Sequence, residues 1–162
     1  MKYYPSKEDN MWNRENIYAM GYTQGLGLSV GSGMRTLNPH DITLDNYCEA
    51  DIKASADDIP EPDNKFDYVY ASHVLEHCVD VIKTLKEWVR VVKVGGQIII
   101  IGPDCRYTPN KSSLYSDPQH KYDWQYEDIR EICKLLTSCQ QVNKNVEAHP
   151  KFSYLIVLRK TK

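Results

Sequence analysis

The amino-acid sequence predicts an α/β fold organised around one β-α-β unit, and three observations support this prediction. Two short runs of apolar, β-branched and aromatic residues occupy positions 66–71 and 98–101. Between them lies a stretch with apolar residues at helical spacing, and the pair Gly95-Gly96 separates that stretch from the second run. A strand, a helix and a second strand in this order give two parallel strands joined by a helical crossover.

The predicted helix begins after Asp80 and runs to about Lys93. Asp80 is a suitable N-cap residue, because a short acidic side chain can accept a hydrogen bond from a free backbone N–H at the start of a helix. We expect Gly95-Gly96 to end the helix, since glycine readily adopts the left-handed conformation found at helix ends. The apolar positions that would face the sheet are Val81, Ile82, Leu85, Val89 and Val92.

Three further strands are predicted before this unit, at residues 25–30, 41–45 and 50–54. The connections between them are short, whereas a crossover between parallel strands usually includes a helix and takes about a dozen residues or more. We therefore expect the helices between the first three strands to be shortened or missing. One face of the sheet would then be exposed or covered by a partner, and a second copy of this chain is one candidate.

After residue 104 the sequence is polar and aromatic until a second amphipathic helix, predicted at residues 127–138. Two closing strands are predicted at residues 141–146 and 152–159. No linker or internal repeat divides the chain, so residues 1–162 are expected to form one domain.

Composition argues against several classes of protein. A formal net charge of −2 provides no electrostatic footprint for nucleic acid. No apolar run approaches the length of a membrane span, and the N-terminus lacks the apolar core of a secretory signal. Five scattered cysteines without a C-x-x-C pair fit reduced thiols. We expect a soluble, cytoplasmic protein with no membrane or nucleic-acid partner.

Parallel strands place their carboxyl ends along one edge of a sheet, and ligands of open α/β sheets bind there. At this edge the sequence puts Ser72 and His73 after the strand at 66–71, and Asp104 after the strand at 98–101. Asp45 ends the strand at 41–45, a position where an acidic residue of nucleotide-binding α/β folds accepts hydrogen bonds from ribose hydroxyls. The alternative for Asp45 is a turn-capping side chain.

Residues 63–77, the helix that follows and Gly95-Gly96 together resemble the central part of class I methyltransferases that depend on S-adenosylmethionine (SAM). The similarity is greatest to the compact bacterial and phage branch, which carries a segment like Leu75-Glu76-His77 after its fourth strand. The resemblance implies a minimal Rossmann-like class I methyltransferase sheet with SAM as the cofactor. It also implies transfer of a methyl group to a small-molecule or carbohydrate-like acceptor.

The resemblance further implies where SAM would bind. The strand at 25–30 enters Gly31-Ser32-Gly33, which is similar to the glycine-rich first motif of the family. Three residues depart from the family pattern: Ser29 and Ser55 stand in place of acidic residues, and Arg35 stands in place of the third glycine. These departures keep open a second interpretation, a methyltransferase-like binding module without turnover. The implied cofactor-binding residues are Val30, Gly31, Ser32, Gly33, Asp45, Asn46, Ser55, Ala56, Asp57, Ser72 and His73.

A general base is needed for methyl transfer only if the acceptor must lose a proton. His73 and His120 are the candidates for this base, and Asp104 is the candidate that would orient it. His120 belongs to residues 120–124, which resemble a stretch containing histidine and tryptophan in the compact branch.

His73, Glu76 and His77 also match the inverted zinc-protease motif His-x-x-Glu-His, for which Glu147 would be the third ligand. That motif needs a helix that continues past both histidines, whereas a new helix is predicted only after Asp80. We therefore expect the motif to lie in a loop, with Glu76 and His77 joining that loop to the sheet by hydrogen bonds. No metal ligand is predicted from the sequence.

Overall fold

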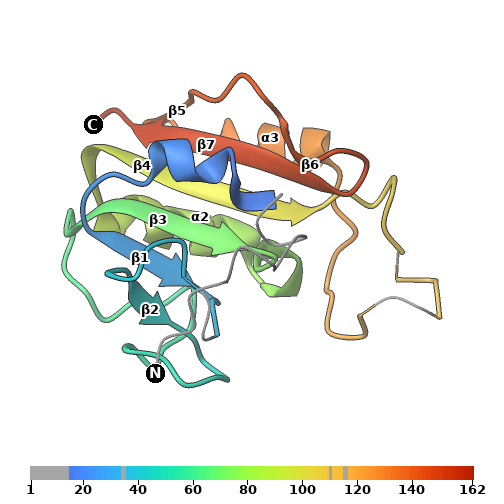
Figure 1. Ribbon diagram of the computed structural model, residues 1–162, viewed down its shortest axis with the longest axis horizontal. Coiled ribbons are helices and arrows are strands. Elements are labelled where there is room, and N and C mark those ends of the chain that lie inside the picture. Colours follow the sequence, from blue (N-terminus) through green and yellow to red (C-terminus); the bar gives the residue numbers. More distant parts are fainter. Residues whose placement is uncertain (1–14, 34–35, 110, 115–116) are drawn as a thin grey trace.

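The computed structural model describes residues 15–33, 36–109, 111–114 and 117–162. These residues form one mixed sheet in the strand order β2-β1-β3-β4-β7-β5, with β6 added to β7 (Figure 1). The strands are β1 (Gly27–Val30), β2 (Ile42–Leu44), β3 (Phe66–Ser72), β4 (Val92–Pro103), β5 (Cys139–Gln141), β6 (Glu147–His149) and β7 (Ser153–Lys160). The helices are α2 (Val81–Val91), α3 (Tyr126–Cys133) and the short 3₁₀ helices η1 (Ala19–Tyr22) and η2 (Leu75–His77). Among the described residues, no helix is both long and apolar enough to span a membrane.

The predicted β-α-β unit is confirmed as the centre of the fold. β3 and β4 run parallel and α2 connects them. Asp80 is the N-cap of α2, and its side chain accepts a hydrogen bond from Lys83 N at 2.9 Å. Residues 98–101 of β4 are at most 1% exposed, which explains why this strand is a continuous apolar run and not an alternating one.

The predicted end of the helix is wrong. α2 ends at Val91, and Val92 already pairs with Phe66 of β3, because this buried residue is drawn into the sheet. Gly95, with φ of +86°, therefore lies inside β4. One β3 residue, Asp67, faces residues 93–96 there, since the next pair is Tyr68 with Gln97. The two glycines form an irregularity in the strand instead of a helix cap.

Among the described residues, no helix lies between β1 and β2 or between β2 and residues 50–54. This agrees with the prediction that these helices are shortened or missing. The strand predicted at residues 50–54 is wrong: only a single bridge remains, between Leu44 and Ile52. The physical reason is Asp51, whose carboxylate accepts hydrogen bonds from the Thr43 backbone N–H (2.9 Å) and hydroxyl (2.8 Å). A side chain thus occupies a donor on the edge of β2 that a longer strand would use.

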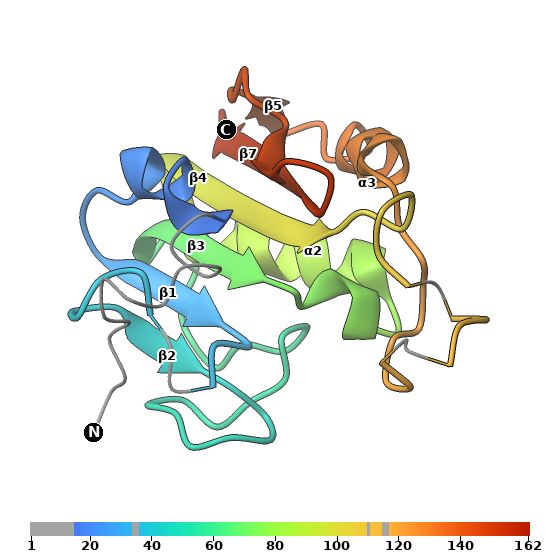
Figure 2. The ribbon, with the colours of Figure 1, turned by 45° about the vertical axis from the view of Figure 1, so that its right-hand side comes forward.

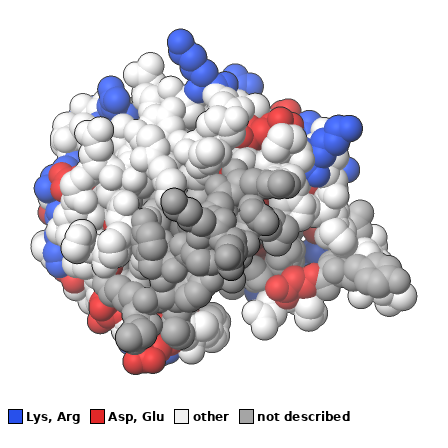
Figure 3. Space-filling view, in the orientation of Figure 1, with Lys and Arg blue, Asp and Glu red and all other residues white. Residues whose placement is uncertain are grey.

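Both faces of the sheet are covered within the single chain. α2 and α3 lie behind the sheet in Figure 1, and η1 lies in front of it. On the front face, Tyr68, Ile99 and Leu155 are fully buried together with Ala19 of η1 and Leu37. The prediction that this face is exposed or covered by a partner is therefore wrong for these residues, because short segments of the chain itself cover them. Charged side chains of both signs lie around the margin of the molecule seen in Figure 3.

The predicted helix and strands of the C-terminal region are confirmed only in part. β7 matches the strand predicted at 152–159 and is antiparallel to β4. The helix predicted at 127–138 is the shorter α3, which starts with a capping box between Gln125 and Asp128. The strand predicted at 141–146 is wrong: only Gln141 of this range lies in a strand, β5, and β6 begins directly after the range. The buried Asn143 side chain lies between them, accepts from Val157 N (2.8 Å) and donates to Leu155 O (2.9 Å), and so replaces backbone pairing.

Asp80→Ala should destabilise the protein by about 1 kcal/mol, because one backbone N–H at the start of α2 loses its acceptor. Asp80→Asn is the matched control, since asparagine caps helices about as well as aspartate does. Urea unfolding at pH 7 followed by circular dichroism measures both variants. Equal loss of stability in the two variants would show that charge, and not the cap, is responsible.

Candidate active site

The predicted site residues lie at the carboxyl edge of the sheet, where β1, β2, β3 and β4 end. These strands are parallel, so the loops that follow them meet at one edge (Figure 2). Backbone hydrogen bonds join neighbouring loops there: Gly31 N donates to Leu44 O at 2.7 Å, and His73 N donates to Ile101 O at 2.9 Å. The edge therefore brings together residues from four separate parts of the sequence.

The loop after β1 has the backbone geometry of a close-approach glycine turn. Gly31 and Gly33 adopt positive φ angles of +60° and +55°, a region that disfavours other residues. A Cβ on Gly31 would lie 2.7 Å from a methyl group of Val74, so the loop packs directly against the segment after β3. Ser32 lies between them and is half-buried. Arg35, at the position of the third glycine, lies outside the described residues.

Asp45 follows β2, is 7% exposed, and holds this glycine loop in place. Its Oδ2 accepts a hydrogen bond from Gly33 N at 2.9 Å, and its Oδ1 accepts from Tyr47 N (2.7 Å) and Cys48 N (2.8 Å). Burial favours the neutral acid, but the three N–H donors outweigh it and lower the pKa of Asp45. A carboxylate has about four acceptor positions, so these contacts leave about one for a ribose hydroxyl. Turn capping and ribose binding are therefore compatible roles. Asn46, the next residue, is exposed.

The segment 55–57 is held against α2. The Ser55 hydroxyl donates to Asp57 Oδ1 at 2.5 Å, and Lys83 of α2 forms an ion pair with Asp57 Oδ2 at 2.9 Å. These hydrogen bonds, from Ser55 first and then Lys83, lower the pKa of Asp57. The Ala56 carbonyl accepts from Trp88 Nε1 at 3.0 Å. Ser55, where the family has an acidic residue, is thus paired with a carboxylate two residues later.

Ser29 is likewise paired with a carboxylate from another part of the chain. Its hydroxyl donates to Asp41 Oδ2 at 2.9 Å, and the Tyr68 hydroxyl donates to Asp41 Oδ1. Asn38 N donates to Asp41 Oδ2 at 3.2 Å, so a buried polar network lies beneath the glycine loop. Sequence reasoning missed the role of Asp41. Its signal was an acidic residue directly before the apolar β2, but only the fold shows that its carboxylate reaches the Ser29 hydroxyl.

His73 follows β3 in a left-handed conformation, with φ of +56°. Its Nε2 lies 3.1 Å from Glu15 Oε1, and its Nδ1 lies 3.5 Å from Glu76 Oε1. Burial alone would lower the pKa of His73, but the two carboxylates outweigh this effect and raise it to about 10. His73 is thus an imidazolium at neutral pH and has no lone pair to accept a proton. This geometry argues against His73 as the general base. Sequence reasoning missed Glu15, which is distant in sequence.

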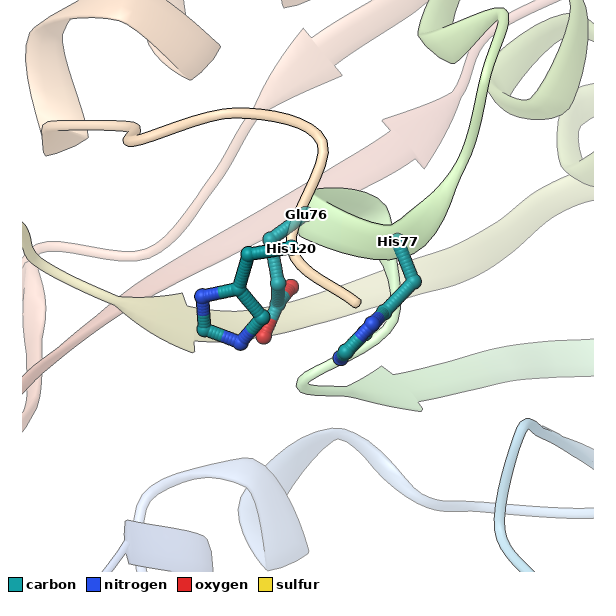
Figure 4. Close-up of side chains that lie close together, drawn as sticks. All are labelled: Glu76, His77 and His120. Carbon is teal, nitrogen blue, oxygen red and sulfur yellow. The ribbon is translucent and has the colours of Figure 1, made fainter. Parts of the chain in front are cut away.

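Glu76, His77 and His120 form a second group beside His73 (Figure 4). Glu76 and His77 come from η2, and His120 comes from the loop between β4 and α3. The two imidazole rings meet edge to face, with their centroids 4.8 Å apart. The His-x-x-Glu-His segment therefore lies in a loop and a 3₁₀ turn, as predicted, and Glu147 does not belong to this group. The expected hydrogen bonds of the Glu76 carboxylate to the sheet are not formed within the described structure.

Asp104 follows β4 and is 4% exposed. Its carboxylate accepts hydrogen bonds from Arg106 Nε (2.9 Å) and Arg106 Nη2 (2.6 Å). Burial favours the neutral acid, but Arg106 outweighs it and lowers the pKa of Asp104. The carboxylate thus positions Arg106 and the turn at 104–108. The side chain that Asp104 orients in this structure is Arg106 and not a histidine. Its role of orienting a catalytic histidine stays a prediction.

Comparison with known proteins identifies the family. Residues 20–100 match the model of the methyltransferase domain family. A demethylmenaquinone methyltransferase of Bacillus licheniformis is 31% identical over 118 residues, which cover 61% of this chain and 51% of that protein. The protein of the same name from Listeria welshimeri is 30% identical over 139 residues, covering 73% of this chain and 56% of the relative. The chain spans about half the length of the curated relatives it matches.

Solved structures agree on the fold. A SAM-dependent methyltransferase from Aquifex aeolicus has a TM-score of 0.66 at 16% identity and covers 96% of both chains. The [4+2]-cyclase SpnF has a TM-score of 0.72 at 14% identity, covering 96% of this chain and 84% of that one. Since a protein named as a cyclase shares the fold, the fold does not fix the reaction. The chain belongs to the methyltransferase domain family and has the minimal Rossmann-like sheet of a class I methyltransferase.

Membership of this family implies SAM as the cofactor, and the residues at the carboxyl edge fit an adenosyl group. The glycine loop presents backbone without Cβ atoms at Gly31 and Gly33. Asp45 retains acceptor capacity beside that loop. Segment 55–57 is fixed to α2 at the next strand end. The assignments of individual residues to SAM stay predictions.

Asp45→Asn should lower the free energy of unfolding by about 1–3 kcal/mol at pH 7, because charged acceptors strengthen hydrogen bonds. The pKa of Asp45 is lowered in the folded protein, so its stabilising effect is present above the unfolded value of 3.8 and is lost as the pH falls through the folded value. The difference between wild type and variant should therefore shrink in acid. Asp58→Asn, at an exposed position, is the control for net charge. An equal loss of stability with Asp58→Asn would contradict the role of Asp45.

Proposed function

We propose that this chain is a SAM-dependent methyltransferase that methylates a small molecule with a hydroxylated ring. The observation that carries the proposal is the connection between Gly33 N and Asp45 Oδ2 at 2.9 Å. It joins a left-handed glycine loop after β1 to an acidic residue after the neighbouring parallel strand. That is the arrangement that binds an adenosine ribose in open α/β sheets.

In this proposal the cofactor lies across the carboxyl ends of β1, β2 and β3. The backbone of Gly31 and Gly33 faces its amino-acid portion, and Asp45 accepts a hydrogen bond from the ribose. Segment 55–57 adjoins the adenine, with Asp57 already held by Lys83. Ser72 and His73 complete the site at the end of β3.

SAM supplies a methyl group on a sulfonium, which is already an activated leaving group. The protein then contributes mainly by holding the acceptor in line and excluding water, which is worth up to about 7–11 kcal/mol. His73, as an imidazolium, is assigned to positioning through its contacts with Glu15 and Glu76. His120 is the remaining histidine candidate for a general base, which would contribute about 10²–10⁴-fold.

Aromatic side chains near His120 favour an acceptor with a ring. Tyr122 and Trp124 stack with their ring centroids 4.7 Å apart, and the Tyr122 hydroxyl donates to Val79 O at 2.8 Å. Trp124 Nε1 is buried without a hydrogen-bond partner in the described structure, so this pair of stacked rings includes an N–H donor that could bind an acceptor. Sugars and quinols both contain a hydroxylated ring, with a hydroxyl oxygen as the acceptor atom in sugars and either an oxygen or a ring carbon in quinols. The curated relatives are named for demethylmenaquinone, which makes a naphthoquinol a specific candidate.

Gly31→Ala should abolish measurable binding of SAM and S-adenosylhomocysteine. The new methyl group would lie 2.7 Å from Val74, at a φ of +60°. Gly95→Ala is the matched control, since Gly95 also has a positive φ but nothing within 4 Å, at the opposite end of the sheet. Calorimetry with both ligands measures the affinities, and thermal melting checks folding. Retained affinity in a folded Gly31→Ala protein would contradict the proposed cofactor site.

Methyl transfer itself is tested with labelled SAM over a panel that contains a naphthoquinol, phenols and free and nucleotide-linked sugars. Label in one ring class identifies the acceptor. Binding of SAM without label in any product would favour the methyltransferase-like binding module. His120→Ala should lower kcat by about 10²-fold or more if His120 is the base. An unchanged kcat would leave catalysis to positioning alone.

A further inference from the structure

We propose that Glu76, His77 and His120 bind one divalent transition-metal ion of the zinc class. The metal-ligating atoms of these three side chains all lie within 4.8 Å of one another. Two imidazole nitrogens and one carboxylate oxygen are a donor set that zinc accepts in proteins. The proposal concerns an ion site and does not depend on methyl transfer.

The group is held together by the backbone as well as by the side chains. Lys121 N donates to the Glu76 carbonyl at 2.6 Å, directly after His120 in the sequence. The Tyr122 hydroxyl donates to Val79 O at 2.8 Å. Two hydrogen bonds therefore hold the loop that carries His120 against η2 and the residues that follow it. Figure 4 shows the Glu76 carboxylate drawn between the two rings.

The buried carboxylate of Glu76 is the independent sign of a missing ligand. Glu76 is 1% exposed, and neither of its carboxylate oxygens has a hydrogen-bond partner in the described structure. Burial of an ionised carboxylate without partners is costly. His73 Nδ1 lies 3.5 Å from Oε1, too far for a good hydrogen bond, and a carboxylate has a second oxygen. A cation on that oxygen would satisfy an acceptor for which the described residues supply no hydrogen bond.

The distances show what binding requires. Zn–N and Zn–O bonds are about 2.0–2.2 Å, so two ligand atoms of one tetrahedral ion lie roughly 3.3–3.6 Å apart. The widest pair here, within 4.8 Å, must close by roughly 1.2–1.5 Å. His77 and His120 are only half-buried, so small rotations of their rings can achieve this. Three protein ligands leave a fourth position of a tetrahedral ion open.

This ion site differs from the zinc-protease motif considered in the sequence. His73 Nε2 is bound to Glu15, and His73 does not belong to the group of three ligands, so it is not assigned as a ligand. Its place is taken by His120, more than forty positions later in the chain. This proposal departs from the sequence interpretation, which named no metal ligand. When an ion is bound, the lone pair of His120 is used for the metal, and His120 then cannot act as a base.

The test measures metal binding by the full chain without SAM or acceptor. Thiols are first blocked, since Cys48 is exposed and Cys78 and Cys105 are partly exposed and could hold adventitious zinc. Titrations with Zn²⁺ by calorimetry and with Co²⁺ by visible absorption give stoichiometry and ligand type. We expect one ion per chain and a cobalt spectrum of nitrogen and oxygen ligands. A stoichiometry of zero, or a thiolate-to-cobalt charge-transfer band, would overturn the proposal.

Three histidine variants locate the ion. His77→Ala and His120→Ala should each weaken Zn²⁺ and Co²⁺ binding at least tenfold. The exposed His40→Ala is the matched control and should bind like wild type. Wild-type affinity in His120→Ala, or an equal loss in His40→Ala, would contradict the site. Glu76→Gln provides a further check, since it keeps the shape of the side chain but removes the charge. It should weaken binding as much as the histidine variants do.

Discussion

The ladder between β3 and β4 is the constraint on which the rest of the structure depends. Successive residues of β4, such as Ile98 and Ile99, face opposite sides of the sheet, and both are fully buried. One side is covered by α2 and α3, and the other by η1 and short segments of the chain. The same parallel register places the ends of four strands at one edge, so the packing of the core determines where the polar loops meet.

Polar side chains stabilise the loops and strand edges of this sheet where helices and longer strands are absent from the described residues. Asp45 holds the glycine loop, Asp51 occupies the edge of β2, and Asn143 bridges β5 and β6 to β7. Each accepts backbone N–H groups that a shortened chain would otherwise leave unpaired. An unpaired buried N–H costs about as much as a lost hydrogen bond. A minimal sheet therefore needs aspartate and asparagine at particular positions.

Sequence reasoning predicted the elements that depend on periodicity and local capping. The β-α-β unit, the Asp80 cap and the missing crossovers required only residue spacing and chain length. Its errors were at places where a distant partner decides. Val92 lies outside the predicted helix because it pairs with Phe66 of β3. The strand at 50–54 is reduced to one bridge because the Asp51 carboxylate binds the Thr43 N–H of β2.

The candidate site shows the same division. Gly31, Gly33 and Asp45 could be found because they end consecutive predicted strands. Glu15 and Asp41 could not be assigned, because their roles come from residues far apart in the sequence, His73 and Ser29. His120 was found by resemblance, but its neighbours Glu76 and His77 were predicted only to join their loop to the sheet by hydrogen bonds. The fold of the loop after β4 was needed to bring the three together.

The charges at this edge also explain why so many acidic residues can be buried side by side. Glu15 and Glu76 are 5% and 1% exposed, and His73 lies between them as a cation. One positive charge cannot fully neutralise two carboxylates, and a buried charge without a partner is costly. Glu15 receives the shorter contact, at 3.1 Å, and Glu76 the longer one, at 3.5 Å. Glu76 therefore has the weaker partner of the two carboxylates, and it is the one that faces His77 and His120.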